Sequence, residues 1–216
     1  MLKRFFNLFN KKDNSITSLS DINEKIDNIF DSLEEHVIKI EIGADLIPYK
    51  SIICDTIFEI RKEIKDECGF VIPIVDIQYN CFLQENELIT YIHRKLCIDS
   101  FLIPNETAIK EEFYEVFKSN MYDSIQALFT NEITEKYISV VQKNNNLLIW
   151  NLTNILSTID IKNILVDIIL KGKSISNINY VFEKIGEQVL NNGEYRDYFK
   201  KYNSHFIARQ VVKNLE

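Results

Sequence analysis

Pairs of acidic residues are the feature of this chain that comes nearest to a catalytic constellation. They occur at Glu34 and Glu35, at Glu111 and Glu112, and at Glu63 with Asp66 and Glu67. Two carboxyl groups can divide acid and base work when a partner shifts the pKa of one of them. No such partner accompanies these pairs, and paired acids on a helix ordinarily face solvent. A small enzyme that uses the segments around Asp45 or Asp76 is the one catalytic alternative left open.

No spacing typical of a metal, a nucleotide or a covalent catalyst is present. The residues that could bind a metal are Cys54, Cys68, Cys81 and Cys97, with His36, His93 and His205. None forms the close pair that a zinc site requires, so the cysteines are expected to be small core residues in a reducing compartment. Ser174 and Ser176 lack the flanking glycines of a nucleophile elbow, and no glycine-rich phosphate loop occurs. We therefore predict a non-enzymatic protein without catalytic, cofactor-binding or metal-binding residues.

Charge and apolar pattern exclude further classes of protein. With 216 residues and a formal net charge of −7, the chain lacks the basic surplus of a general nucleic-acid binder, so no nucleic-acid partner is expected. Partners with basic or apolar surfaces fit this charge better. No run reaches the roughly 20 apolar residues of a membrane-spanning helix, and the N-terminus lacks a signal-peptide cleavage site. The expectation is a cytoplasmic protein that does not itself form a membrane channel.

The first twelve residues, MLKRFFNLFNKK, form a short basic segment with helical periodicity. Its apolar residues at i, i+3, i+4 and i+7 are Leu2, Phe5, Phe6 and Phe9. Lys3, Arg4, Lys11 and Lys12 supply its positive charge. Such a segment can lie on an anionic membrane at the inner face, with Leu2, Phe5, Phe6, Phe9, Lys3 and Arg4 as the contacts. A frayed or self-packed terminus is the alternative.

Aromatic residues in expected loops are the candidates for protein recognition. Tyr49 and Tyr79 lie in such loops and could contact a partner, although ordinary packing is the alternative for both. Trp150 follows Leu148 and Ile149 and is therefore expected in the core rather than at a surface.

Periodicity divides the chain into an N-terminal α/β part and a helical part. The α/β part is expected to contain helices at 20–35 and 51–68, strands at 37–42, 70–77 and 96–102, and a hairpin that joins 82–83 to 88–92 around 84–87. Gly69 suits the position that ends the second helix, and Pro73 would need a bulge or a sheet edge. From residue 105 onward the period is helical, with helices expected at 107–129, 131–142, 147–156, 160–170, 174–190 and 194–215.

These elements predict an α+β protein, with a small mixed β-sheet and a packed helix followed by an all-helical bundle. Three segments are expected: a basic amphipathic segment and linker at 1–19, an α/β unit at 20–104, and a helical bundle at 105–216. With only 5 glycines and 3 prolines, the composition disfavours an all-β fold with many tight turns.

Two strings and the helix between them carry a family resemblance. They are residues 40–48, IEIGADLIP, and residues 69–73, GFVIP. Together they resemble the start of the cytoplasmic half of the export-gate family of flagellar and type III secretion systems. Further likenesses follow in the family's order: IRK at 60–62, Asn80 with Leu83 and Asn86, residues 128–132, KGKSISNI at 171–178, and ARQV at 208–211. The resemblance covers most of 38–212 and implies an α/β subdomain followed by a helical subdomain.

The departures from the family pattern limit what the resemblance implies. The family has R-D where this chain has Gln78 and Tyr79, and a hairpin proline where it has Glu85. A subdomain that the family inserts before the first bundle helix is reduced here to residues 94–105, and the membrane half and the final subdomain have no counterpart. That inserted subdomain carries much of the family's docking surface for export chaperones. No family binding residue is therefore transferred to this chain.

The resemblance implies a non-enzymatic protein-interaction or scaffold domain that is part of, or derived from, a protein export apparatus. Its partners would be export-apparatus subunits, chaperones or further copies of itself in a homo-oligomer, with peripheral contact to an anionic membrane. Two alternatives stay open. One is a soluble adaptor that binds secretion chaperones or substrates, and the other is the same domain reused outside secretion.

Overall fold

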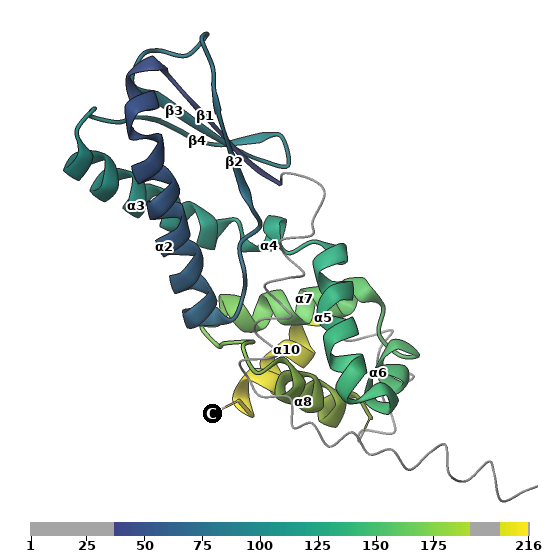
Figure 1. Ribbon diagram of the computed structural model, residues 1–216. Coiled ribbons are helices and arrows are strands. Elements are labelled where there is room, and N and C mark those ends of the chain that lie inside the picture. Colours follow the sequence, from purple (N-terminus) through teal and green to yellow (C-terminus); the bar gives the residue numbers. More distant parts are fainter. Residues whose placement is uncertain (1–36, 191–203, 216) are drawn as a thin grey trace, which may run out of the picture.

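A four-stranded sheet with two long helices beside it occupies one end of the molecule, and a helical bundle occupies the other (Figure 1). The computed structural model describes residues 37–190 and 204–215. The elements are β1 (Ile38–Ile42), η3 (Ala44–Tyr49), α2 (Lys50–Cys68), β2 (Val75–Tyr79), β3 (Glu87–Ile92), β4 (Lys95–Phe101), α3 (Glu106–Asp123), α4 (Ile125–Leu128), α5 (Asn131–Asn144), α6 (Asn146–Thr153), α7 (Thr158–Leu170), α8 (Ile178–Leu190) and α10 (Ser204–Lys213). The predicted α+β class, with a small mixed sheet followed by helices, is confirmed. The segment 1–19 and the helix expected at 20–35 lie outside the described residues.

The sheet has the strand order β2-β1-β3-β4. β1 pairs in parallel with β2 and antiparallel with β3, and β3 pairs antiparallel with β4. Along β1 the fully buried Ile38, Ile40 and Ile42 alternate with Lys39 and Glu41, which are only half-buried. Because side chains of a strand point alternately to its two faces, one face of the sheet enters the core and the other is polar. The strand expected at 37–42 is confirmed.

An apolar stripe explains why α2 forms, and a terminal glycine explains where it ends. Four isoleucines, Ile53, Ile57, Ile60 and Ile64, recur at helical spacing and are buried in the same core as β1. Gly69 ends the helix with φ 76°, a left-handed conformation that glycine adopts without steric penalty, and its N–H donates to the Lys65 carbonyl at 2.8 Å. The helix expected at 51–68 and its glycine terminus are confirmed.

The hairpin expected around 84–87 is wrong. β3 instead pairs with β4 through His93 and Arg94, while residues 80–86 form a loop. This turn was missed because both residues have positive φ, 48° and 64°, whereas hairpin turns of this kind are ordinarily marked by Asn or Gly. A ring nitrogen of His93 lies 3.0 Å from the Ala127 carbonyl oxygen. The backbone N–H of His93 donates to the Val37 carbonyl at 2.9 Å. These bonds hold the turn in a conformation that its sequence disfavours.

The strand expected at 70–77 begins later than predicted. β2 starts only at Val75, so Pro73 precedes it and needs no bulge. Phe70, Val71 and Ile72 are buried but take no part in the sheet, because they fill the core where the α/β part meets the helices. A buried apolar run alone therefore did not distinguish a strand from an irregular core segment.

Two expectations about the core are also wrong. Trp150 is 62% exposed, because α6 turns its neighbours Ile149 and Leu152 inward and leaves the indole outside. Cys54 and Cys81 are exposed, whereas Cys68 is buried. Cys54 lies one position after the buried Ile53, on the solvent face of α2. For Trp150 and Cys54, the apolar residue that precedes each of them in the sequence is buried, while their own side chains face solvent.

The helical part begins with α3, which packs along α2. Asn105 caps α3, since its side chain accepts from the N–H groups of Thr107 and Ala108. The single helix expected at 107–129 is divided, because α3 ends at Asp123 and α4 begins at Ile125. α5, α6, α7, α8 and α10 then pack on one another. A domain boundary near residue 104 stays a prediction.

An aromatic cluster, here called the joint, connects the α/β part to the bundle. Phe129 stacks between Phe70 at 5.2 Å and Tyr137 at 5.5 Å, measured between ring centroids. The Tyr137 hydroxyl donates to the Gly69 carbonyl at 3.2 Å. Close by in sequence, the Cys68 carbonyl accepts from the N–H of Ile175 at 2.8 Å. The loop before α8 is thereby fixed to the end of α2.

Candidate functional site

The loops that follow β1, β2 and β4 and precede β3 gather at one end of the sheet. The register places them there, because Ile42 pairs with both Tyr79 and Leu88, and Glu87 pairs with Phe101. Backbone bonds join the loops, from Gly43 to the Glu87 carbonyl at 2.9 Å and from Leu102 to the Asn86 carbonyl at 3.0 Å. This end of the sheet lies remote from the helical bundle (Figure 1).

Five exposed apolar side chains lie at this end and define what we call the sheet-end surface. Their exposed fractions lie between 47% and 93%, and the residues are Ile47, Tyr79, Phe82, Phe101 and Ile103. Scattered exposed apolar residues are normal on a protein, but several at one end of a sheet are typical of an interaction site. Phe82 is the most exposed of them and lies in the loop after β2.

The two tyrosines predicted as partner contacts have different surroundings. Tyr79 is the last residue of β2 and is 55% exposed at the sheet-end surface. Tyr49 ends η3, is half-buried, and donates from its hydroxyl to the Pro104 carbonyl at 2.9 Å. Tyr49 therefore has a structural bond that ties the start of α2 to the segment before α3. A role in partner binding stays a prediction for both residues.

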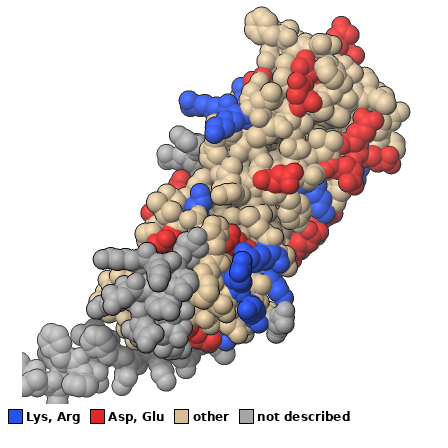
Figure 2. All heavy atoms as spheres, turned by 180° about the vertical axis from the view of Figure 1, so that it is seen from behind, with Lys and Arg blue, Asp and Glu red and all other residues tan. Residues whose placement is uncertain are grey.

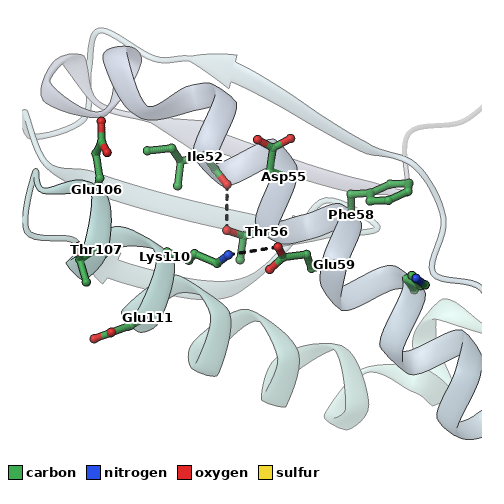
Figure 3. A pocket seen from close by; sticks show the side chains of 10 residues that line it. Ile52, Asp55, Thr56, Phe58, Glu59, Glu106, Thr107, Lys110 and Glu111 are labelled. Carbon is green, nitrogen blue, oxygen red and sulfur yellow. Dashed lines mark hydrogen bonds and ion pairs between the residues drawn. The ribbon is translucent and has the colours of Figure 1, made fainter.

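A groove with a volume of about 700 Å³ lies between the N-terminal parts of α2 and α3, and we call it the α2–α3 groove (Figure 3). Its lining residues include Ile52, Asp55, Phe58, Glu59 and Lys62 from α2 and Glu106, Lys110 and Glu111 from α3. Lys110 reaches across to Glu59, with 3.1 Å between the ammonium and the carboxylate. Phe58 projects from α2 and is 66% exposed. The groove thus combines apolar and acidic surface.

Below the groove, a polar seam connects α2 to α3. Lys118 lies 2.8 Å from Glu63 and 3.3 Å from Glu67, while the Tyr114 hydroxyl donates to Glu63 and the Tyr122 hydroxyl donates to Glu67. The bond from Lys118 lowers the pKa of Glu63, and the bond from Tyr122 lowers the pKa of Glu67. The same contact with Glu63 raises the pKa of Lys118. All three groups are therefore held in their charged forms, which suits a structural seam better than proton transfer.

The seam predicts a pH-dependent effect of Lys118→Met. A carboxyl whose pKa is lowered by folding stabilises the protein above its ordinary pKa, and that contribution is lost as the pH falls through the lowered value. We expect the variant to lose about 0.5–1 kcal/mol of unfolding free energy at pH 7. The loss should shrink as the pH falls below the ordinary pKa of a glutamate, about 4.3, toward the lowered pKa of Glu63. Urea unfolding at pH 7 and at lower pH measures the loss of unfolding free energy and its change with pH.

Lys62→Met is the matched control, because Lys62 lies on α2 next to Glu63 but has no ion-pair partner in the part of the chain that the structure describes. Its effect should be small and should not change with pH. A loss at Lys118 that is equally large at every pH would contradict the role of the two carboxylates.

The open face of the sheet carries a second, smaller concavity of about 390 Å³. Lys39 lies 2.7 Å from Glu41, which also accepts from the Asn80 amide at 2.7 Å, and both contacts lower the pKa of Glu41. Asp76 accepts from the Gln78 amide on the same face. Asp45 is exposed at the start of η3. The geometry does not bring these two aspartates into one site with a nucleophile or a base.

Residues 37–190 and 204–215 contain neither a metal-binding cluster nor a helix able to span a membrane. Within these ranges no group of three or more His, Cys, Asp and Glu side chains could hold a metal ion. No helix in the same part of the chain has the length and apolar content needed to cross a bilayer. The predicted membrane contacts Leu2, Lys3, Arg4, Phe5, Phe6 and Phe9 lie outside the described residues.

The strings that carry the family resemblance contact one another in the fold. Gly43 has no room for a side chain, because a Cβ there would lie 2.6 Å from the Glu85 carbonyl oxygen. Glu41 of the same string accepts from Asn80, another position of the resemblance. These positions therefore hold the sheet-end loops together.

The second set of strings behaves in the same way. Gly69 lies against the backbone of Ser176, in the KGKSISNI string, and Arg61 of the IRK string donates to the Ile72 carbonyl at 2.9 Å. Ala208 and Val211 of the ARQV string are fully buried in α10, which packs on α7. The resemblance thus identifies residues that build the fold.

Of the sheet-end surface, the sequence indicates only Tyr79, and it indicates nothing of the α2–α3 groove. Phe82 was placed in a strand, and exposed apolar residues at strand ends have no distinct pattern. Phe58 could have been found, because it is an apolar residue on the charged face of α2, between Asp55 and Lys62. The groove depends on packing between helices that start 56 residues apart, at Lys50 and Glu106, so no local pattern indicates it.

Comparisons with known proteins identify the fold. The sequence matches no protein-family model and no curated protein. Among solved structures, the chain is similar to one in the Chlamydia pneumoniae CdsV and CdsO complex, with 12% identity and a TM-score of 0.65 over 84% of this chain and 65% of that one. It is also similar to nonameric EPEC SctV-C, with 12% identity and a TM-score of 0.61 over 83% and 66%.

Shigella flexneri MxiA gives 10% identity and a TM-score of 0.58 over 81% of this chain and 61% of that one. The chain therefore spans between three fifths and two thirds of the length of these three structures. The fold implied by the resemblance to export-gate cytoplasmic domains is confirmed.

Proposed function

We propose that this chain is a non-enzymatic protein-interaction domain that is part of, or derived from, a type III export apparatus. The observation that carries the proposal is the fold shared with CdsV, SctV-C and MxiA over more than four fifths of the chain. One of these proteins is described in complex with CdsO and another as a nonamer. We propose by analogy that this chain binds copies of itself or another protein, in the cytoplasm and with its N-terminal segment on an anionic membrane.

The exposed apolar residues of the sheet-end surface support this proposal. Phe82, Phe101 and Ile103 are exposed in an acidic protein, and exposed aromatic anchors are typical of the residues that dominate binding between proteins. Because the family motifs are used for packing, the contacts with a partner would be made by residues specific to this chain.

Sedimentation velocity of the full chain over a range of concentrations tests the proposal. We expect association beyond the monomer, and we expect Phe82→Ser to weaken it about tenfold or more, as the loss of an interface anchor does. Trp150→Ser is the control, since Trp150 is also exposed but lies on α6, away from the sheet end. With anionic vesicles, the double variant Phe5→Ser and Phe9→Ser should lose co-sedimentation while the parent chain retains it.

Capture experiments in the native cell distinguish the two forms of the proposal. Export-apparatus subunits would support an apparatus component, and secretion chaperones or substrates would support an adaptor. A strict monomer that ignores vesicles and captures neither class would overturn the proposed function.

A further inference from the structure

The α2–α3 groove has the dimensions of a site for a short helix. Its α2 lining runs from Ile52 to Lys62, which is ten helical steps or about 15 Å, and its volume is about 700 Å³. Phe58 lies within that span and is 66% exposed, so the groove offers an apolar contact that the described part of the chain leaves open to solvent. A helix of two to three turns spans the same length and presents apolar residues at i, i+3, i+4 and i+7.

The groove walls favour a helical occupant over an extended one. Both walls are helices whose backbone groups bond within the helix, so they present no row of free N–H and C=O groups to a β-strand. The polar atom in the floor is also satisfied, since the buried Thr56 hydroxyl donates to the Ile52 carbonyl at 2.8 Å. Recognition in the groove must therefore come from side-chain packing and charge.

The charges of the groove select a basic occupant. Lys110 is paired with Glu59, which leaves Asp55, Glu106 and Glu111 against Lys62 alone. None of these three carboxylates has an ion-pair partner within residues 37–190 and 204–215. Figure 2 shows Asp and Glu gathered on the upper part of the molecule, where the sheet, α2 and α3 lie.

An anionic ligand at the start of α3 is disfavoured by the cap of that helix. The N–H groups of Thr107 and Ala108 would be the donors for an anion, and the Asn105 side chain already accepts from both. From these contacts we propose that the α2–α3 groove binds an amphipathic helix of a partner protein, whose apolar stripe packs on Phe58 and whose flanking Lys or Arg residues face Asp55, Glu106 and Glu111. This inference rests on the proposed function as a protein-interaction domain and adds the chemistry of the partner.

Binding of a synthetic helix to the full chain, followed by backbone amide resonances, tests the proposal. The probe is a 15-residue peptide with leucine and phenylalanine on one helical stripe and lysine beside it. We expect saturable shifts at Asp55, Phe58, Lys62 and Lys110, and weaker binding as salt is added, because exposed charge pairs are screened. A peptide of the same composition, shuffled so that the stripe is lost, should bind at least tenfold more weakly.

Variants of the groove complete the test. Asp55→Lys with Glu111→Lys should weaken binding tenfold or more, and Phe58→Ser should do so without changing the net charge. Asp99→Lys with Glu85→Lys is the matched control, because both residues are exposed acids outside α2 and α3. Equal binding of both peptides, shifts that map elsewhere, or unchanged binding by the groove variants would overturn the proposal.

The groove proposal and the proposed function can fail independently of each other. If the chain associates or captures partners but the striped peptide does not bind in the groove, the groove proposal alone fails. If the peptide binds in the groove but the chain is a strict monomer without cellular partners, the groove proposal stands and the export-apparatus proposal fails.

Discussion

Gly69→Ala is expected to lower the free energy of unfolding by about 2–5 kcal/mol, since it combines two separate penalties. The first is the left-handed backbone at φ 76°, which disfavours any residue with a Cβ. The second is steric, because a Cβ at this position would lie 2.6 Å from the Ser176 Cα and 2.7 Å from the Ile175 carbonyl carbon. Both atoms belong to the backbone and cannot rotate away. Urea unfolding followed by far-ultraviolet circular dichroism measures the loss.

Gly172→Ala provides a matched control for the steric part. Gly172 has nearly the same φ, 73°, but a Cβ there would have no neighbour within 4 Å. This variant should therefore lose only the conformational part, about 1–2 kcal/mol. Gly69→Asn supplies the complementary control, because asparagine tolerates the left-handed region but still carries a Cβ. If Gly69→Asn is as stable as the parent chain, the close packing of Gly69 against Ser176 is not what limits this position.

Gly69 also illustrates which parts of the fold were predictable. Its place at the end of an amphipathic helix could be predicted, because the isoleucine stripe of α2 and a terminal glycine are local features. The alternation in β1 was equally clear, since only one face of that strand is buried. The contact between Gly69 and Ser176 could not be predicted, because it joins residues more than one hundred positions apart through the packing of two separate segments.

The candidate interaction surfaces were less predictable than the core. Periodicity indicates which residues are buried, but a surface site is made of exceptions such as Phe58 and Phe82, which are exposed despite their apolar type.

The turn at His93 and Arg94 was missed for a related reason. Its left-handed backbone is maintained by bonds to Val37 and Ala127, which lie in other parts of the chain. Tertiary contacts there override the local preference of the sequence.

Phe129→Ala is the second substitution for which a large effect is expected. The ring is fully buried and stacks on both Phe70 and Tyr137, so its removal leaves a cavity at the joint between the α/β part and the bundle. Large-to-small changes of this kind lower the free energy of unfolding by about 3–5 kcal/mol. Phe101→Ala removes the same atoms from a side chain that is 53% exposed, and it should change stability by less than about 0.5 kcal/mol.

The position of Phe129 adds an expectation about cooperativity. Phe70 follows α2, while Tyr137 belongs to α5, so the ring connects elements of both parts of the molecule. In the parent chain, amide hydrogens of β1 and of α7 should exchange with similar free energies, because opening either part exposes the joint. In Phe129→Ala the two values should separate. Tyr137→Phe, which keeps the ring and removes the hydroxyl that donates to the Gly69 carbonyl, should lose about 1 kcal/mol of unfolding free energy and leave the two exchange values together. Equal exchange in Phe129→Ala would mean that other contacts, such as the bond from Ile175 to Cys68, couple the two parts without the aromatic stack.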